Sequence, residues 1–230
     1  MKNVIFIAPP AAGKGTQSNR LVELGYEHIS TGDILREEIA KKTDLGLIIK
    51  DIISKGYLVS DEIVFKLIKN KLTNLNKPFI LDGFPRTLNQ AILLDELLVE
   101  LNQTNYRVIY LDIELEEALK RALGRLTCKC GTSYNNEFAL LKPKVDGVCD
   151  KCGSILEKRN DDNEESFKVR FETFIKNNEP IKDFYISKDK LDIIDTKIES
   201  EKITDIIKEI LNDNTKKRKR NWVNETCWVY

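Results

Sequence analysis

Short apolar runs alternate with amphipathic stretches along most of the 230-residue chain. The runs have the length and β-branched content of buried parallel strands, and the stretches carry apolar residues at helical spacing. Strands are predicted at residues 4–7, 26–29, 79–82, 106–113 and 191–195. Helices are predicted from residues 31 and 87 and over residues 14–24, 44–55, 63–74, 114–125 and 199–211. This order predicts an α/β fold with a parallel five-stranded sheet flanked by helices.

Two stretches break the alternation. Residues 126–160 are rich in cysteine, glycine and polar residues, which indicates a small lobe inserted into the main domain. A helix capped by Asp161 or Asp162 is predicted to follow this lobe, with Pro180 breaking or restarting it. Residues 212–230 carry a Lys-Lys-Arg-Lys-Arg run. Such a run can bind nucleic acid, but at a terminus it is more often a solvated end, so we expect a disordered tail and no nucleic-acid partner.

The first predicted strand leads directly into a phosphate-binding sequence. Residues 8–17 read Ala-Pro-Pro-Ala-Ala-Gly-Lys-Gly-Thr-Gln and open a helix. A strand, a tight loop and a helix start direct backbone N–H groups and the helix dipole at one anion. We expect Lys14 to reach the β- and γ-phosphates of a nucleotide, and Thr16 to bind Mg²⁺ directly or through water. Ala8 stands at the first glycine position of the general pattern.

Another predicted strand, 79–82, ends in the carboxylate of Asp82 and is followed by Gly-Phe-Pro-Arg. Ligands gather at the carboxyl ends of the strands in a doubly wound sheet. We therefore expect Asp82 to hold Mg²⁺ through its waters, as acidic groups at strand ends do in phosphoryl-transfer sites.

Arginine is scarce in this chain: of 37 basic residues, only ten are arginine. The planar guanidinium binds phosphate through two parallel hydrogen bonds, which lysine cannot reproduce. Six arginines lie in or beside the motifs: Arg36, Arg86, Arg121, Arg125, Arg159 and Arg170. They predict a second anionic ligand, and so an enzyme of phosphoryl transfer that works by positioning and charge neutralisation.

Some of these residues allow a second interpretation. Arg36, near a helix start, is a phosphate contact or a solvated surface charge. Gln90 follows Thr87 by three residues, so it completes a helix capping box or reads a base with its amide. Arg121 and Arg125 are four residues apart on one predicted helix face, which is an exposed basic face or a site for an anion between them.

Four of the five cysteines lie in the inserted lobe: Cys128, Cys130, Cys149 and Cys152. Clustering of this kind in a cytosolic protein indicates a metal rather than disulfides. The second pair has the Cys-x-x-Cys-Gly form of a zinc knuckle, whereas the first pair, Cys-x-Cys, is one residue short of the usual spacing. We predict a structural Zn²⁺ that supplies folding energy to a lobe with little core. The rival interpretation is a lobe that keeps its cysteines and binds metal poorly.

Composition excludes several classes of protein. Apolar residues make up 41% and charged residues 32% of the chain, and the formal net charge is zero, as in an ordinary soluble domain without a bias toward nucleic acid or membranes. No apolar run approaches the length of a membrane-spanning helix, and the apolar start is too short for a secretory signal, so we expect a cytoplasmic protein. The single histidine, His28, gives no partner for nucleophilic catalysis and is interpreted as structural.

The motifs together resemble the adenylate kinase family, in its long-lid bacterial form with a cysteine-bearing lid. The resemblance covers about residues 3–211 and rests on residues 13–17, 30–33 and 82–87 and on Arg159-x-Asp161-Asp162. It implies reversible phosphoryl transfer from ATP to AMP with Mg²⁺, giving two ADP, by a monomer. It also implies a core of residues 1–29, 60–125 and 161–211, an AMP-binding lobe at 30–59 and a lid at 126–160.

The resemblance further implies a role for individual residues. The residues implied for ATP are Ala11, Ala12, Gly13, Lys14, Gly15, Thr16, Arg125, Ser133, Tyr134 and Lys197. The residues implied for AMP are Thr31, Arg36, Tyr57, Leu58, Val59, Gly83, Phe84, Pro85, Arg86, Gln90, Arg159 and Arg170. The catalytic residues implied are Lys14, Arg86, Arg121, Arg159 and Arg170.

The chain departs from the family pattern at three places. Ala8 and Ala11 stand where the family commonly has glycine, and no glycine separates Asp195 from Thr196. Two other functions remain open from the sequence: a kinase for UMP, CMP or GMP, and an inactive module that binds nucleotide without turnover.

Overall fold

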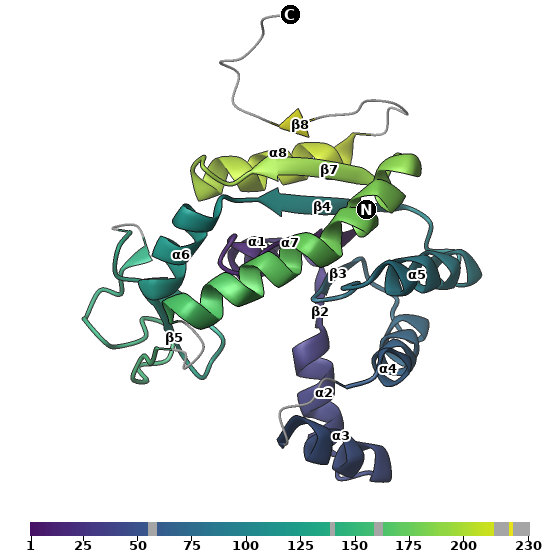
Figure 1. Ribbon diagram of the computed structural model, residues 1–230, viewed down its shortest axis with the longest axis horizontal. Coiled ribbons are helices and arrows are strands. Elements are labelled where there is room, and N and C mark those ends of the chain that lie inside the picture. Colours follow the sequence, from purple (N-terminus) through teal and green to yellow (C-terminus); the bar gives the residue numbers. More distant parts are fainter. Residues whose placement is uncertain (55–58, 139–140, 159–162, 214–220, 223–230) are drawn as a thin grey trace, which may run out of the picture.

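The computed structural model describes residues 1–54, 59–138, 141–158, 163–213 and 221–222. Its main sheet is parallel, with the strand order β2-β3-β1-β4-β7-β8 (Figure 1). The five predicted strands are confirmed as β1 (Asn3–Ile7), β2 (Glu27–Ser30), β3 (Phe79–Asp82), β4 (Tyr106–Asp112) and β7 (Leu191–Asp195). A two-residue strand that was not predicted, β8 (Asn221–Trp222), pairs with β7 at the sheet edge.

The central strands are apolar throughout because helices cover both faces of the sheet. Val4 and Phe6 of β1 face one hydrophobic cluster, and Ile5 and Ile7 face another. The first cluster includes side chains of α1 (Lys14–Glu23), α6 (Leu115–Leu123) and α8 (Ser200–Asn212), and the second includes those of α4 (Asp61–Thr73) and α5 (Leu88–Glu100). A strand buried on both faces lacks the apolar-polar alternation of a half-buried one.

Two parts project from this layered body. Helices α2 (Thr31–Ala40) and α3 (Asp44–Ser54) pack on each other and extend beyond the sheet (Figure 1). On another side, β5 (Arg125–Thr127) and β6 (Ser133–Asn135) form a separate antiparallel pair. The described part of the chain contains no helix long and apolar enough to cross a lipid bilayer.

The long helix α7 (Glu164–Ser187) corrects two predictions. Its N-cap is Asn163, whose Oδ1 accepts a hydrogen bond from Ser166 N at 3.0 Å, rather than Asp161 or Asp162, which lie outside the described residues. Pro180 lies inside the helix and does not break it. A proline in a helix interior costs about 3 kcal/mol. Ile181 and Tyr185, both fully buried just beyond it, offset that cost by packing in the core.

The prediction that Arg121 and Arg125 share a helix face is wrong. Helix α6 ends at Leu123 with Gly124 as its C-cap, and Arg125 is the first residue of β5. A Cβ at Gly124 would lie 2.5 Å from Asn135 Oδ1, so a larger residue there would displace the Asn135 side chain, whose Nδ2 donates to the Arg121 carbonyl at 2.8 Å. Helix α2 begins at Thr31, and Ser30 occupies its N-cap position.

Candidate active site

The turn between β1 and α1 forms the predicted phosphate loop, which we define as residues 8–16. Ala11 has a φ of 64° and Gly13 a φ of 90°, so both adopt the left-handed conformation. Ala8 does not adopt a positive φ. Of the two alanines that replace glycine, only Ala11 is therefore strained, by about 1–2 kcal/mol. Helix α1 begins at Lys14, within this loop, so that the free N–H groups of the helix start belong to the loop.

Lys14, Asp82 and His28 meet at the carboxyl ends of three adjacent strands. Lys14 Nζ lies 2.7 Å from Asp82 Oδ1, and His28 Nε2 lies 3.3 Å from Asp82 Oδ2. Burial favours the neutral form of Asp82, but the hydrogen bond with His28 and the charge of Lys14 outweigh burial and lower its pKa to about 2. The carboxylate is therefore ionised at neutral pH, as a ligand of hydrated Mg²⁺ must be.

Sequence reasoning assigned no chemistry to His28, although it contacts the central carboxylate of the site. The missed signal is the pairing of β2 with β3, in which Ser30 lies opposite Asp82. His28 is two residues earlier on β2, so it lies on the same side of the sheet. Pairing between strands that are 50 residues apart cannot be read from the sequence pattern alone.

Two of the residues implied for AMP, Thr31 and Arg86, contact a third, Gly83. Thr31 Oγ1 donates to the Gly83 carbonyl at 3.4 Å, and Arg86 Nε donates to the same carbonyl at 2.8 Å. Gly83 has a φ of 82°, and a Cβ there would lie 2.6 Å from Thr31 Oγ1. Glycine at this position therefore serves both the turn and the close approach of Thr31. Arg36, on α2, is ion-paired with Asp33.

Gln90 is buried and uses both ends of its side-chain amide. Its Oε1 accepts from Arg86 N at 2.7 Å, and its Nε2 donates to Asp61 Oδ1 at 2.5 Å. The Thr87 cap is confirmed, because Thr87 Oγ1 accepts from Gln90 N at 3.2 Å. The Gln90 side chain does not complete the predicted capping box, since it accepts from Arg86 N rather than from Thr87 N.

On the other side of the sheet, the side chain of Arg121 reaches the segment after β7. Arg121 Nη2 donates to the Thr196 carbonyl at 2.8 Å, and Arg121 Nε donates to Glu117 at 2.9 Å. Lys197 Nζ forms an ion pair with Glu114 at 2.7 Å. Lys120 joins Glu117 and Lys197 in lining an open pocket of about 430 Å³. Arg121 and Lys197, both predicted site residues, thus lie beside one another.

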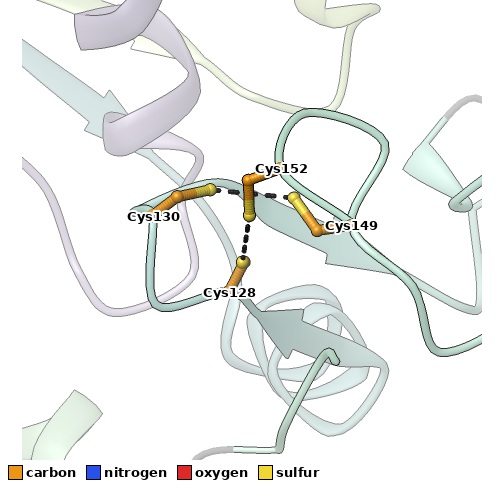
Figure 2. A group of neighbouring side chains, drawn as sticks. All are labelled: Cys128, Cys130, Cys149 and Cys152. Atoms are coloured by element: carbon orange, nitrogen blue, oxygen red, sulfur yellow. Dashed lines mark hydrogen bonds between the residues drawn. The ribbon is translucent and has the colours of Figure 1, made fainter. Parts of the chain in front are cut away.

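The four lid cysteines are brought together (Figure 2). Their sulfur atoms all lie within 4.8 Å of one another, with 3.3 Å between Cys128 and Cys152 and 3.7 Å between Cys130 and Cys149. A tetrahedral Zn²⁺ with Zn–S bonds of about 2.3 Å separates its sulfur ligands by about 3.8 Å. The shortened Cys-x-Cys turn therefore still brings four sulfur atoms together at distances close to those of a tetrahedral zinc site.

Tyr134 contacts this cysteine cluster. Its hydroxyl lies 3.5 Å from Cys149 Sγ and accepts from Asp150 N at 2.7 Å. The hydrogen bond from Tyr134 lowers the pKa of Cys149 to about 6, which favours the thiolate form that binds metal. Sequence reasoning placed Tyr134 only at ATP and missed this contact.

The remaining predicted residues are spread over several elements. Arg170 lies on the exposed surface of α7, and Val59 and Ser133 lie just before α4 and at the start of β6. Tyr57, Leu58 and Arg159 lie outside the described residues.

Comparison with known proteins agrees with this arrangement. The sequence profile of the family described as Adenylate kinase matches residues 6–190. An adenylate kinase of Thermosipho africanus is 41% identical over 214 residues, which cover 91% of this chain and 98% of that protein. One from Archaeoglobus fulgidus is 48% identical, covering 81% of this chain and 87% of that protein, and one from Lactobacillus helveticus is 43% identical, covering 93% and 100%. The chain therefore belongs to the adenylate kinase family.

Proposed function

We propose that this protein catalyses the reversible transfer of a phosphoryl group from ATP to AMP, giving two ADP. The contact of Lys14 with Asp82, at the junction of the phosphate loop and the Asp-Gly-Phe-Pro-Arg segment, is the observation that carries this proposal. It joins the cation that would bind the ATP phosphates to the carboxylate that would hold Mg²⁺ through water. The remaining arginines then serve an acceptor that is itself a phosphate ester.

ATP would bind at residues 11–16, with Arg125, Ser133 and Tyr134 on the lid side and the Lys197 backbone beside the adenine. The N–H groups at the start of α1 would donate to the phosphates, and Lys14 would leave Asp82 to reach the β- and γ-phosphates. Magnesium supplies charge neutralisation on the phosphates when bound, and the ionised Asp82 fits the task of holding its waters.

AMP would bind on the Gly83 side of the sheet. Thr31, Arg36, Val59 and Arg86 would contact AMP there, and Gln90 would exchange Asp61 for the base. Gly83, Phe84 and Pro85 would supply the backbone against which AMP lies, and Tyr57 and Leu58 complete the proposed set. Arg86, Arg121, Arg159 and Arg170 would bridge the transferring phosphoryl group, with closure of both lobes excluding water that would otherwise cause hydrolysis.

We further propose that the lid binds one structural Zn²⁺ through Cys128, Cys130, Cys149 and Cys152. The spacing of the sulfur atoms and the lowered pKa of Cys149 support this assignment. Cysteines that are clustered for a metal rather than joined in disulfides are typical of a reducing compartment, and we propose that the protein acts as a cytoplasmic monomer.

The decisive experiment measures ADP formation from Mg·ATP with AMP, UMP, CMP, GMP or no acceptor. We expect turnover with AMP that far exceeds turnover with the other monophosphates. Greater turnover with another monophosphate would keep the reaction and replace the acceptor. A folded, metal-loaded protein that turns over none of them would overturn the proposal and leave a nucleotide-binding module.

A further inference from the structure

A buried polar cluster joins α1 to α8. It consists of Gln17 and Arg20 on α1 and of Ser200 and Thr204 on α8. Gln17 is 2% exposed and Thr204 is 6% exposed, in the middle of an otherwise apolar contact between the two helices. Polar side chains are costly in such a place unless every donor and acceptor is satisfied.

The cluster meets this requirement through short hydrogen bonds. Gln17 Nε2 donates to the Ser200 carbonyl at 3.0 Å and to Ser200 Oγ at 3.2 Å. Thr204 Oγ1 donates to Gln17 Oε1 at 2.7 Å. Both ends of the Gln17 amide are therefore bound to α8. These bonds fix the side-chain conformation of Gln17 and the orientation of the first turn of α1 relative to α8.

Arg20 adds a charged member to the same cluster. Its Nη1 donates to the Ser200 carbonyl and to Thr204 Oγ1, both at 2.7 Å, and its Nη2 pairs with Glu201 at 2.6 Å. The Thr204 hydroxyl thus accepts from Arg20 and has its one hydrogen within reach of two acceptors, Gln17 Oε1 at 2.7 Å and, at the longer distance of 3.0 Å, the Ser200 carbonyl. Removal of this one hydroxyl leaves a buried amide oxygen without its donor and a guanidinium without one of its acceptors.

The two ends of the cluster lie next to the two ends of the proposed ATP site. Gln17 is three residues after Lys14, and Ser200 is three residues after Lys197. The segment before Ser200 is also fixed, because Thr196 N and Oγ1 both donate to the Asp112 carbonyl, at 2.9 and 2.8 Å. The cluster therefore joins the helix that follows the phosphate loop to the helix that follows the proposed adenine-side segment.

We propose that Gln17, Arg20 and Thr204 are positioning residues that set the placement of the phosphate loop relative to the adenine-side segment, and thereby the affinity for ATP. The proposal rests on the assignment of ATP to residues 11–16 and Lys197 made above. None of the three side chains needs to touch ATP. They act through Lys14 and the helix start, whose geometry they hold before the nucleotide binds.

The test compares Thr204→Val with Thr204→Ser in the full-length protein. Valine keeps the shape of threonine but removes the hydroxyl, whereas serine keeps the hydroxyl. Initial rates are measured with ATP varied at saturating AMP and with AMP varied at saturating ATP, well below the melting temperature of each variant. Thr73→Val is the matched control, because the Thr73 hydroxyl, on the exposed end of α4, donates to the Lys69 carbonyl of its own helix.

We expect Thr204→Val to raise the KM for ATP roughly fivefold and to leave the KM for AMP within about twofold. Thr204→Ser should restore most of the ATP KM, and Thr73→Val should change neither constant. Equal changes in both constants, or a lowered melting temperature with unchanged KM values, would show a purely structural cluster and overturn the proposal. Should Thr204→Val fold poorly, Arg20→Met at the partly exposed edge provides the same comparison.

A separate variant distinguishes failure of this inference from failure of the site assignment. Lys14→Ala should lose most activity if the phosphate loop binds ATP, because no other side chain replaces its charge. Near-normal turnover in Lys14→Ala would reject the site, whatever Thr204→Val does. Loss of activity in Lys14→Ala together with an unchanged ATP KM in Thr204→Val would reject only the positioning role.

Discussion

At the scale of single residues, the phosphate loop shows how a substitution can be tolerated at a cost. Ala11 holds a φ of 64°, a conformation in which a Cβ crowds the following carbonyl oxygen. Ala8, the other alanine at a usual glycine position, avoids the left-handed region. The two positions look equivalent in the sequence, and only the backbone conformation separates them.

This difference predicts opposite effects of the same substitution. Ala11→Gly should raise the free energy of unfolding by about 0.5–1 kcal/mol, because relief of strain exceeds the entropy that glycine adds to the unfolded chain. Ala8→Gly should lower it by at least a similar amount, since it adds that entropy and also removes a methyl group that is buried in the core. Urea unfolding of both variants measures the two free energies. A loss of stability in Ala11→Gly equal to that in Ala8→Gly would contradict the strain at Ala11.

At the scale of elements, the α2–α3 pair depends on one close approach. A Cβ at Gly46 would lie 2.3 Å from the Glu38 carbonyl oxygen, which is closer than atoms can come without movement of the backbone. The junction is also fixed by Thr43, whose Oγ1 donates to Glu38 Oε1 at 2.6 Å and accepts from Gly46 N at 3.0 Å. Helix α3 can therefore pack on α2 only where glycine removes the obstruction.

We predict that Gly46→Ala pushes α3 away from α2, at a cost of about 1–3 kcal/mol within this projecting part. If the α2–α3 part binds AMP, the KM for AMP should rise severalfold while the KM for ATP stays near its original value. Leu47→Ala, at an exposed neighbouring position of the same helix, is the control and should change neither constant. An ATP KM that rises as much as the AMP KM would indicate global destabilisation instead.

At the scale of the whole molecule, the sequence predicts the features that depend on local patterns of residues and misses those that depend on contacts between distant residues. The strands were found because burial on both faces of the sheet leaves continuous apolar runs, as at Phe79–Asp82. The end of α6 was missed because it depends on contact with Asn135. The continuation of α7 through Pro180 was missed because it depends on the burial of Ile181 and Tyr185. The pairing of His28 with Asp82 and of Gln17 with Thr204 joins distant residues that no local pattern connects.

The lid differs from the rest of the molecule in how it is held together. Among the residues that the structure describes, its apolar cluster consists of Leu126, Leu156 and the partly buried Tyr134, together with two of the cysteines. The sheet, in contrast, is covered by large clusters on both faces. A lobe with so little core needs another source of folding free energy, and a bound Zn²⁺ can supply on the order of 10 kcal/mol.

We therefore predict that removal of metal unfolds the lid and leaves the sheet intact. A strong chelator should make the lid segment around Cys128–Cys152 sensitive to limited proteolysis, while the circular dichroism of the core changes little. Activity should fall with the loss of lid structure and return when Zn²⁺ is added. Cys152→Ser should reproduce this state without chelator, whereas Cys227→Ser, which changes the cysteine outside the cluster, should behave as the unmodified protein. A lid that resists protease after metal removal would show that its few apolar contacts suffice, and would assign the four cysteines no structural role in holding it folded.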